Sequence, residues 1–332
     1  MTIRVLRLLA NFLTLLCVGT PHAQAIREEP DMRVILLGTG GPELTPNRAG
    51  YATLVEAGGQ TLLFDAGRDV LQRLYESRIK VTDVTQVFFT HLHSDHIEGL
   101  PGLWMTPWFL LGRDKPMHVW GPYGTADMIN GMQTMFQFDM TYRANPFNDI
   151  RNLRFTVTEM KEGVIYNYGG IQVTAFSVWH GDGNPAFGYR IDYRNRSVVL
   201  SGDTTFSDHV VSYGRGADLI VHNVIAMSER LSGAPEMRPV LAKLTTPEQA
   251  ARVFIEARPR MAVFSHIVKK ELPGRYGDEL IMQRVRDAGY HGPLVMGYDR
   301  MVIEIGNTVR VFQPITTDGL SDVDRKVSYA AH

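Results

Sequence analysis

Four side chains that can bind a metal ion stand within six residues of one another, in Thr90-His91-Leu92-His93-Ser94-Asp95-His96. The apolar residues 86–89 before them predict a buried strand. Alternation along an extended chain puts His91 and His93 on one side, where they can bind one ion together. Asp95 and His96 then turn toward a second ion as the chain enters a helix. Several imidazoles packed together without a ligand would cost desolvation and charge repulsion, so the motif predicts a metal centre.

Three further potential ligands each come just after a predicted strand. His180 follows residues 171–179, Asp203 follows residues 197–200, and His266 follows residues 261–265. Ligands that stand at strand ends are held on a rigid sheet and can meet at one rim of it. We therefore expect these three side chains to join the motif in one site.

The number of ligands predicts two ions with open coordination. The first ion takes His91, His93 and His180, the second takes Asp95, His96 and His266, and Asp203 bridges the two. Three protein ligands per ion and a bridge leave room for a shared hydroxide, which is typical of catalytic zinc. The many histidines favour two zinc ions over magnesium or calcium. Asp95 is predicted to serve both as a ligand and as a shuttle for the proton of the water.

Short β-branched and aromatic segments alternate with a few helical ones along the chain. Helices are predicted at 70–79, 125–135, 247–257 and 277–288, and strands at 33–37, 51–56, 61–64, 86–90, 117–120, 155–159, 171–178, 187–193, 197–200, 219–221, 261–264, 294–296 and 302–305. This mixture of hairpins and strand–helix units favours an α/β fold with two sheets covered by helices. No linker rich in Pro, Gly or Ser divides the chain, so one domain is predicted over residues 26–332.

The first 25 residues have the pattern of a cleavable signal peptide. Arg4 and Arg7 precede an apolar stretch, residues 8–18, and Ala23-Gln24-Ala25 forms a small-x-small cleavage site. We expect cleavage before Ile26, a periplasmic or secreted protein, and no stable membrane association afterwards. Cys17 is the only cysteine, so the mature chain must bind metal through His, Asp or Glu.

The overall charge is close to zero. There are 34 Lys and Arg residues against 35 Asp and Glu residues, which gives a net charge of −1. Nucleic-acid-binding and membrane-surface proteins usually carry a basic excess. The composition therefore predicts no nucleic-acid partner, and the partner we expect is a small-molecule ester substrate.

The chain resembles the metallo-β-lactamase superfamily over most of its mature length, and within it the ribonuclease Z and arylsulfatase-like branch. The segments that carry the resemblance are the metal motifs together with Leu36-Leu37-Gly38-Thr39-Gly40, Phe64-Asp65-Ala66-Gly67, Gly99-Leu100-Pro101-Gly102-Leu103, Gly121-Pro122, Gly188-Tyr189-Arg190-Ile191, Gly202-Asp203-Thr204 and Phe264-Ser265-His266. The resemblance implies a four-layer αββα sandwich, a hydrolase with two zinc ions, a homodimer, and a supporting role for Asp65 behind the ligands.

Two departures from the branch bear on its activity. Only 22 residues separate His180 from Asp203, which leaves no room for the long arm that grips tRNA in ribonuclease Z. Leu244 stands where the branch has a histidine that is its expected proton donor. Both departures predict that this chain does not mature tRNA. Protonation of the leaving group must then come from elsewhere, with His222 as one candidate, or be unnecessary because the leaving group is good.

The sequence leaves three functions open. An exported zinc hydrolase that cleaves an aryl sulfate, a phosphodiester or a similar activated ester is the first. The alternatives are a β-lactamase or lactonase, and a non-catalytic metal-binding protein. An apolar stretch after the motif, which includes Trp104 and Trp108, is either a substrate wall or part of the core.

Overall fold

The first of two β-sheets has eight strands. The computed structural model describes residues 29–313; the predicted signal peptide and both ends of the predicted domain lie outside this range. The strands stand in the order β15 (Val309–Phe312), β14 (Met301–Ile305), β1 (Met32–Gly38), β2 (Ala52–Ala57), β3 (Gln60–Phe64), β4 (Gln86–Phe88), β5 (Met117–Gly121) and β6 (Phe155–Glu159). Pairing is antiparallel from β15 to β3 and parallel from β3 to β6, so the sheet is mixed.

The second sheet has seven strands and is also mixed. Its order is β13 (Leu294–Met296), β12 (Met261–Lys270), β11 (Leu219–Met227), β10 (Arg196–Leu200), β9 (Ala186–Tyr193), β8 (Ile171–Val178) and β7 (Gly163–Tyr168). Strands β10 to β13 are parallel, and β7 to β10 are antiparallel. The apolar alternation of strands such as β8 gives one face to each of two buried layers.

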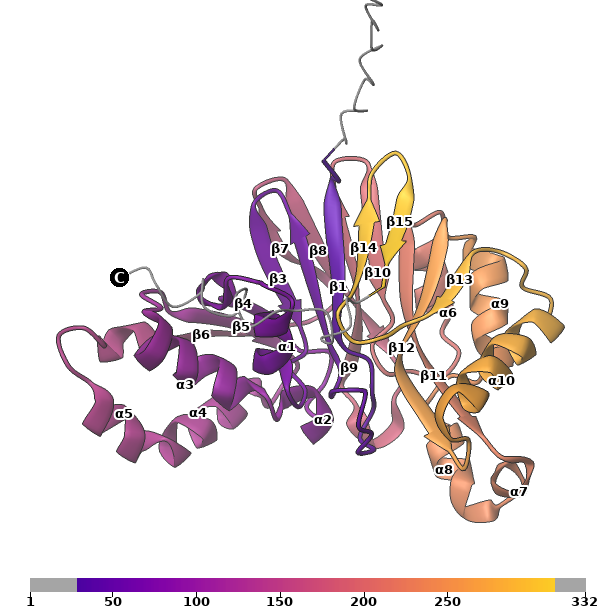
Figure 1. The fold of residues 1–332 in the computed structure, drawn as a ribbon, viewed down its shortest axis with the longest axis horizontal. Coiled ribbons are helices and arrows are strands. Elements are labelled where there is room, and N and C mark those ends of the chain that lie inside the picture. Colours follow the sequence, from indigo (N-terminus) through magenta and orange to yellow (C-terminus); the bar gives the residue numbers. More distant parts are fainter. Residues whose placement is uncertain (1–28, 314–332) are drawn as a thin grey trace, which may run out of the picture.

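Helices cover the outer face of each sheet (Figure 1). Their bounds are α1 (Val70–Glu76), α2 (Ser94–Ile97), α3 (Leu100–Leu111), α4 (Thr125–Met135), α5 (Gln137–Arg143), α6 (Asp208–Gly214), α7 (Glu229–Ser232), α8 (Arg238–Leu241), α9 (Pro247–Ala257) and α10 (Gly274–Asp287), with short 3-10 turns η1 (Val81–Asp83), η2 (Ile150–Leu153), η3 (Gly181–Gly183) and η4 (Pro235–Met237). One buried cluster lies between the sheets, a second packs α1, α3 and α4 on the first sheet, and a third packs α6, α9 and α10 on the second. The expected αββα sandwich is confirmed.

Two strands run well past the ends that the sequence predicts. Strand β11 continues to Met227 and β12 to Lys270, beyond the polar residues at which both predictions stop. The segment between β11 and α9 folds on these extensions as a small lobe with α7, η4 and α8, seen at the lower right of Figure 1. A fourth apolar cluster forms the interior of this lobe, and Leu244 is part of it. Polar residues in mid-strand, His222 and Asn223 in β11 and Ser265 and His266 in β12, hid this continuation, because the expected strand pattern is apolar.

The apolar stretch after the metal motif belongs to the core. It forms α3, in which Trp104 and Trp108 are fully buried against the first sheet. Their indole N–H groups donate to the backbone oxygens of Leu153 and Asp149, over 3.0 Å in both cases. A buried indole with a satisfied donor is a packing element. The tryptophans therefore do not form a substrate wall.

Within residues 29–313, no helix is both long and apolar enough to span a bilayer.

Candidate metal centre

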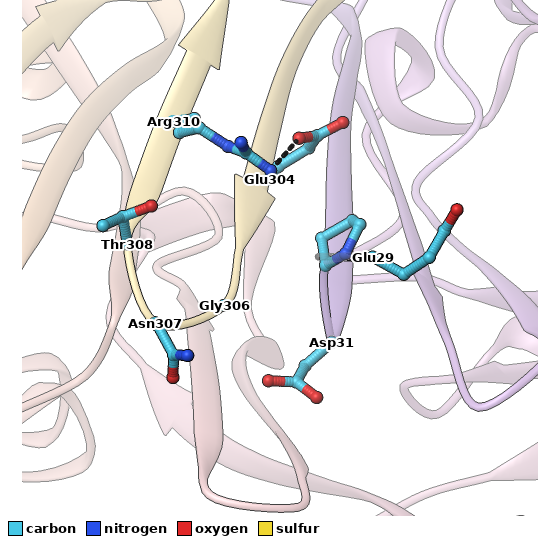
Figure 2. Close-up of a pocket in the computed structure, with 8 residues that line it drawn as sticks. Glu29, Asp31, Glu304, Gly306, Asn307, Thr308 and Arg310 are labelled. Atoms are coloured by element: carbon cyan, nitrogen blue, oxygen red, sulfur yellow. Dashed lines mark ion pairs between the residues drawn. The ribbon is translucent and has the colours of Figure 1, made fainter. Parts of the chain in front are cut away.

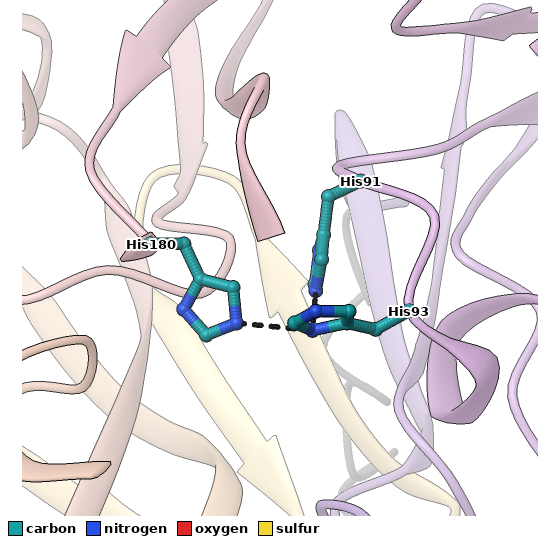
Figure 3. Close-up of side chains that lie close together, drawn as sticks. All are labelled: His91, His93 and His180. Atoms are coloured by element: carbon teal, nitrogen blue, oxygen red, sulfur yellow. Dashed lines mark hydrogen bonds between the residues drawn. The ribbon is translucent and has the colours of Figure 1, made fainter. Parts of the chain in front are cut away.

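Three histidines from both sheets meet at one end of the sandwich (Figure 3). His91 and His93 lie on the loop that follows β4, and His180 follows β8. Nε2 of His91 lies 3.0 Å from Nδ1 of His93, and Nε2 of His180 lies 3.3 Å from the same Nδ1. The predicted trio is therefore assembled. His93 presents its Nδ1 atom to the others, whereas His91 and His180 present Nε2.

A second group lies beside the first. Nε2 of His266 is 3.2 Å from Oδ2 of Asp95 and 3.1 Å from Oδ2 of Asp203. Nε2 of His96 is 3.6 Å from both of these carboxylate oxygens. Oδ2 of Asp203 also lies 3.6 Å from Nε2 of His180, in the first group. Asp203 thus stands between the two groups, as predicted for a bridging ligand.

The donor set fits two metal ions. The ligand atoms of three overlapping triads each lie within 4.8 Å of one another, and the triads are His91, His93 and His180; His91, His96 and Asp203; and Asp95, His96 and His266. Nε2 of His96 and Oδ1 of Asp203 are buried and have no hydrogen-bond partner in the described chain. Buried polar atoms without partners are costly unless a cation takes their lone pairs. These residues are therefore suited to hold a divalent metal.

Charge is concentrated in the cluster in the absence of a cation. Burial opposes the charged form of His96, but the carboxylates of Asp203 and Asp65 outweigh it and raise the pKa of His96 well above its ordinary value. Burial likewise opposes ionisation of Asp203, and His266 and His96 nevertheless hold its pKa well below the usual range. The carboxylate of Asp203 is thus ionised at neutral pH, which is the form that binds metal.

The carboxylate of Asp65 orients two of the histidines. Its Oδ2 atom accepts from Nδ1 of His96 over 2.9 Å and from the hydroxyl of Thr90 over 2.8 Å. The hydroxyl of Thr90 in turn accepts from Nδ1 of His91 over 3.0 Å. Because both Nδ1 atoms carry their protons, both Nε2 atoms are free to bind metal. The predicted supporting role of Asp65 matches this geometry, whereas Thr90 was not anticipated although it begins the motif.

His180 is oriented by the backbone of the lobe. Its Nδ1 atom donates to the carbonyl oxygen of Lys243 over 2.8 Å. The turn η3 that follows His180 then passes directly over the three histidines at Gly183. A Cβ atom on Gly183 would lie 2.3 Å from Cδ2 of His180, 2.8 Å from Cε1 of His93 and 3.0 Å from Cδ2 of His91. Only glycine fits this approach.

His266 reaches the site through a bulge in β12. The β11–β12 register shifts between His222/Phe264 and Val224/Ile267, which leaves an extra residue on β12. The backbone of His266 has a φ of 45°, in the left-handed region. A bulge of this kind aims a side chain away from the regular alternation of the strand. Strand periodicity alone could not have placed His266.

The loop that carries Asp203 is held from below. Gly202 has a φ of +60°, and a Cβ there would lie 2.4 Å from the backbone oxygen of Phe187. The carbonyl oxygen of Thr204 accepts from the side-chain amide of Asn223 over 2.9 Å and from the hydroxyl of Thr245 over 2.7 Å. Asn223 and Thr245 therefore hold the loop of Asp203 in place through the Thr204 carbonyl, and no local sequence pattern indicated either contact.

His222 is fully buried on the helix-covered side of the second sheet. Its ring lies 5.7 Å from that of Phe254 in α9, and its Nδ1 atom donates to the backbone oxygen of Asn223 over 2.9 Å. Burial lowers its pKa to about 4. Among the described residues, no hydrogen bond, ion pair or ring contact joins His222 to any of the seven ligands. The geometry gives no support to His222 as a proton donor, and that role stays an untested prediction.

A polar hollow of about 370 Å³ is lined by residues at the start of β1 and along the β14–β15 hairpin (Figure 2). Arg310 pairs with Glu304 over 3.0 Å, and Asp31 and Asn307 both accept from Arg196. These charged groups therefore satisfy one another within the wall. None of the seven ligands lines this hollow.

Comparison with known proteins places this geometry in a family. A family model described as anti-Pycsar protein Apyc1 matches residues 32–234. Ribonuclease Z of Mycolicibacterium gilvum is 34% identical over 252 residues, which are 74% of this chain and 88% of that protein. The chain belongs to the ribonuclease Z-like branch of the metallo-β-lactamase superfamily. Ribonuclease Z of Mycobacterium bovis is 31% identical over 279 residues, 82% of this chain and 98% of that protein.

Solved structures of the superfamily share the fold. The metallo-β-lactamase fold protein YhfI from Bacillus subtilis superposes with a TM-score of 0.64 at 16% identity, covering 83% of this chain and 99% of that chain. The short form of human tRNase Z superposes with a TM-score of 0.61 at 24% identity, covering 82% and 99%. At these identities both likenesses bear on the fold alone.

The prediction that nucleic acid is excluded as a partner is wrong. Relatives that align with this chain over most of their own length are named ribonuclease Z. That name denotes action on RNA. The prediction rested on the neutral net charge and on the missing arm. Net charge averages over the whole surface, and an arm is one means of gripping tRNA. Neither quantity describes whether a phosphodiester can enter the metal centre.

Replacing Asp65 by Asn tests the support behind the ligands. We expect Asp65→Asn to weaken metal affinity about 10- to 100-fold, because an amide cannot accept from Thr90 and His96 as the carboxylate does. Competition with a chromophoric chelator measures this affinity. The exposed Asp83→Asn is the matched control. Unchanged metal affinity in Asp65→Asn would contradict the orienting role.

Adding one methyl group at Gly183 tests the close approach of η3. In Gly183→Ala the new Cβ would collide with the rings of the first trio, so we expect about one metal ion per chain to be lost. Metal content by mass spectrometry of the purified protein measures this. Gly131→Ala on α4, where the new Cβ meets nothing within 4 Å, is the control and should keep the wild-type metal content.

Proposed function

We propose that this chain is an exported phosphodiester hydrolase that works with two zinc ions. The observation that carries the proposal is the convergence of seven ligand side chains on one buried site with Asp203 between the two groups. Its three protein ligands per ion favour open, catalytic coordination. Export rests on the leader predicted from residues 1–25.

Among esters, sequence similarity to ribonuclease Z favours phosphodiesters as the substrate class. The relatives named ribonuclease Z share about a third of their residues with this chain over most of their length. A nuclease of that kind breaks a phosphodiester bond. We extend this bond type to the present chain.

The ligands divide the work by their position. When bound, two zinc ions would supply a hydroxide from a shared water and polarise the bond under attack. Asp95 belongs to the second group and is 7% exposed, and we assign to its carboxylate the passing of a proton between the site and solvent. Asp65 and Thr90 keep the imidazoles of His96 and His91 in the tautomer that binds metal.

Position 244 limits the leaving groups that the site can handle. Leu244 is 5% exposed and packs with Ile225, Met227 and Val268 in the interior of the lobe. A hydrocarbon side chain cannot protonate a departing oxygen. We therefore expect the enzyme to cleave esters whose leaving group is stable as an anion, such as a phenolate, much faster than those with an alkoxide leaving group.

Metal content and turnover test the proposed function together. We expect about two zinc ions in the mature chain, and hydrolysis of bis(p-nitrophenyl) phosphate that exceeds that of an aryl sulfate, a lactone or a cephalosporin. His93→Ala should lower turnover by at least about 100-fold, because it removes a ligand from the first trio. Two metal ions with no turnover of any phosphodiester, RNA included, would argue against the proposal.

Restoring a histidine at position 244 tests the leaving-group argument. Leu244→His should raise turnover of diesters with alkoxide leaving groups and change that of nitrophenyl diesters little, so the dependence of rate on leaving-group pKa should flatten. It should also cost about 1–3 kcal/mol of folding stability, because an imidazole replaces a packed leucine. Leu244→Met, which preserves the packing without an acid, is the control. An unchanged dependence in the folded histidine variant would contradict this account.

A further inference from the structure

We propose that Lys243 is the residue that recognises the negative charge of the substrate, and that Asp182 holds its ammonium group at the site until the substrate takes the place of Asp182. The inference rests on the proposed phosphodiester substrate, which carries one negative charge at neutral pH. It assigns to this chain a specificity-determining contact beside the metal ligands.

Lys243 is fixed beside the first trio by its own backbone. Its carbonyl oxygen accepts from Nδ1 of His180 over 2.8 Å, so the Cα atom cannot move without disturbing a ligand. Its side chain runs back along η3, where a Cβ on Gly181 would lie 3.5 Å from Cβ and 3.8 Å from Cδ of Lys243. The side chain therefore lies along the turn that follows His180.

The ammonium group of Lys243 ends on η3, the turn that covers the first trio. Nζ of Lys243 donates to Oδ1 of Asp182 over 2.7 Å, and this aspartate stands between the two glycines of η3. Gly183, the next residue, passes directly over the rings of His91, His93 and His180. His93 is only half-buried, so it borders the opening to solvent.

In the ion pair between Lys243 and Asp182, a substrate can take the place of Asp182. The Asp182 side chain is 71% exposed, whereas that of Lys243 is 25% exposed. An exposed ion pair contributes little to folding stability, so Asp182 can be displaced at small cost. A phosphodiester oxygen offers the ammonium group a similar charge-assisted hydrogen bond, and lysine binds phosphate as a point charge that needs no fixed geometry.

Leu244 and Lys243, which are adjacent in the chain, point in different directions. Leu244 is buried in the lobe, while Lys243 turns outward to η3. The chain thus keeps the backbone contact to His180 and presents a permanent positive charge beside the site. Such a charge binds the substrate anion in the ground state and in the transition state alike, which lowers KM and leaves kcat nearly unchanged.

Two substitutions with opposite expected effects test the proposal. Lys243→Met removes the charge and should raise KM for bis(p-nitrophenyl) phosphate about tenfold with little change in kcat. Asp182→Asn removes the competitor and should lower KM a few-fold. Lys243→Arg, which keeps a cation, should restore most of the wild-type KM. If the ion pair only pins η3 in place, Lys243→Met and Asp182→Asn should impair the enzyme alike, and that result would overturn the proposal.

Binding of an unreactive anion provides a readout besides turnover. The affinity for dimethyl phosphate, measured by calorimetry on the zinc-loaded protein, should fall in Lys243→Met and rise in Asp182→Asn. Neither variant alters the carbonyl of residue 243, so both should keep the wild-type metal content. Lys80→Met and Asp83→Asn, which break an exposed ion pair of 3.1 Å on another part of the surface, are the matched controls and should leave the affinity unchanged.

The two proposals fail in different ways. A zinc-loaded wild-type protein that cleaves no diester but binds dimethyl phosphate, with an affinity that falls in Lys243→Met, would contradict the proposed function and leave the Lys243 contact supported. A wild-type protein that cleaves the diester, together with a Lys243→Met variant that binds and cleaves it equally well, would contradict only the role of Lys243. If Lys243→Met lost as much affinity for the neutral triester trimethyl phosphate as for dimethyl phosphate, that result would also contradict recognition of charge.

Discussion

The structure depends on one constraint, which is that seven side chains able to bind metal converge on one site, where polar atoms such as Nε2 of His96 and Oδ1 of Asp203 are buried without a hydrogen-bond partner. Nitrogen and carboxylate atoms of this kind repel one another and lose the hydrogen bonds that water would give them. Asp203 shows the conflict most clearly, because one of its oxygens lies near three histidines while the other has no partner in the described chain. A divalent cation resolves the conflict, and the scaffold must hold the ligands ready for it.

The scaffold holds the ligands in place with left-handed backbone conformations and with hydrogen bonds from residues that do not bind metal themselves. Asp65 and His266 both adopt left-handed conformations, with φ of 58° and 45°, which non-glycine residues enter only when the surroundings over-determine them. Asp65 uses that conformation to accept two bonds from Thr90 and one from His96. Rigidity at the site therefore comes from residues such as Asp65 and Thr90 that hydrogen-bond to the ligands. The apolar core between the two sheets holds these residues in place.

The sequence predicted the parts of the site that are local and left out those that depend on tertiary contact. His91 to His96 are recognisable because the ligands stand within one turn of chain, and His180 and Asp203 follow strands whose apolar character is plain. Lys243 was missed because it acts on His180 through a carbonyl oxygen, which no residue type signals. His222 was selected for standing next to a predicted strand end, but β11 continues through it and buries its ring against Phe254.

The same distinction between average and local properties explains the error about nucleic acid. A net charge of −1 states that acidic and basic groups balance over the chain, and it says nothing about where an individual charge stands. Beside the first trio stand one lysine and its exposed aspartate partner, next to the ligands that call for a metal. Because the Debye length in physiological salt is about 8 Å, a substrate at that site responds mainly to charges within one or two side-chain lengths. Substrate charge is therefore better inferred from the residues that border the ligands than from the composition of the chain.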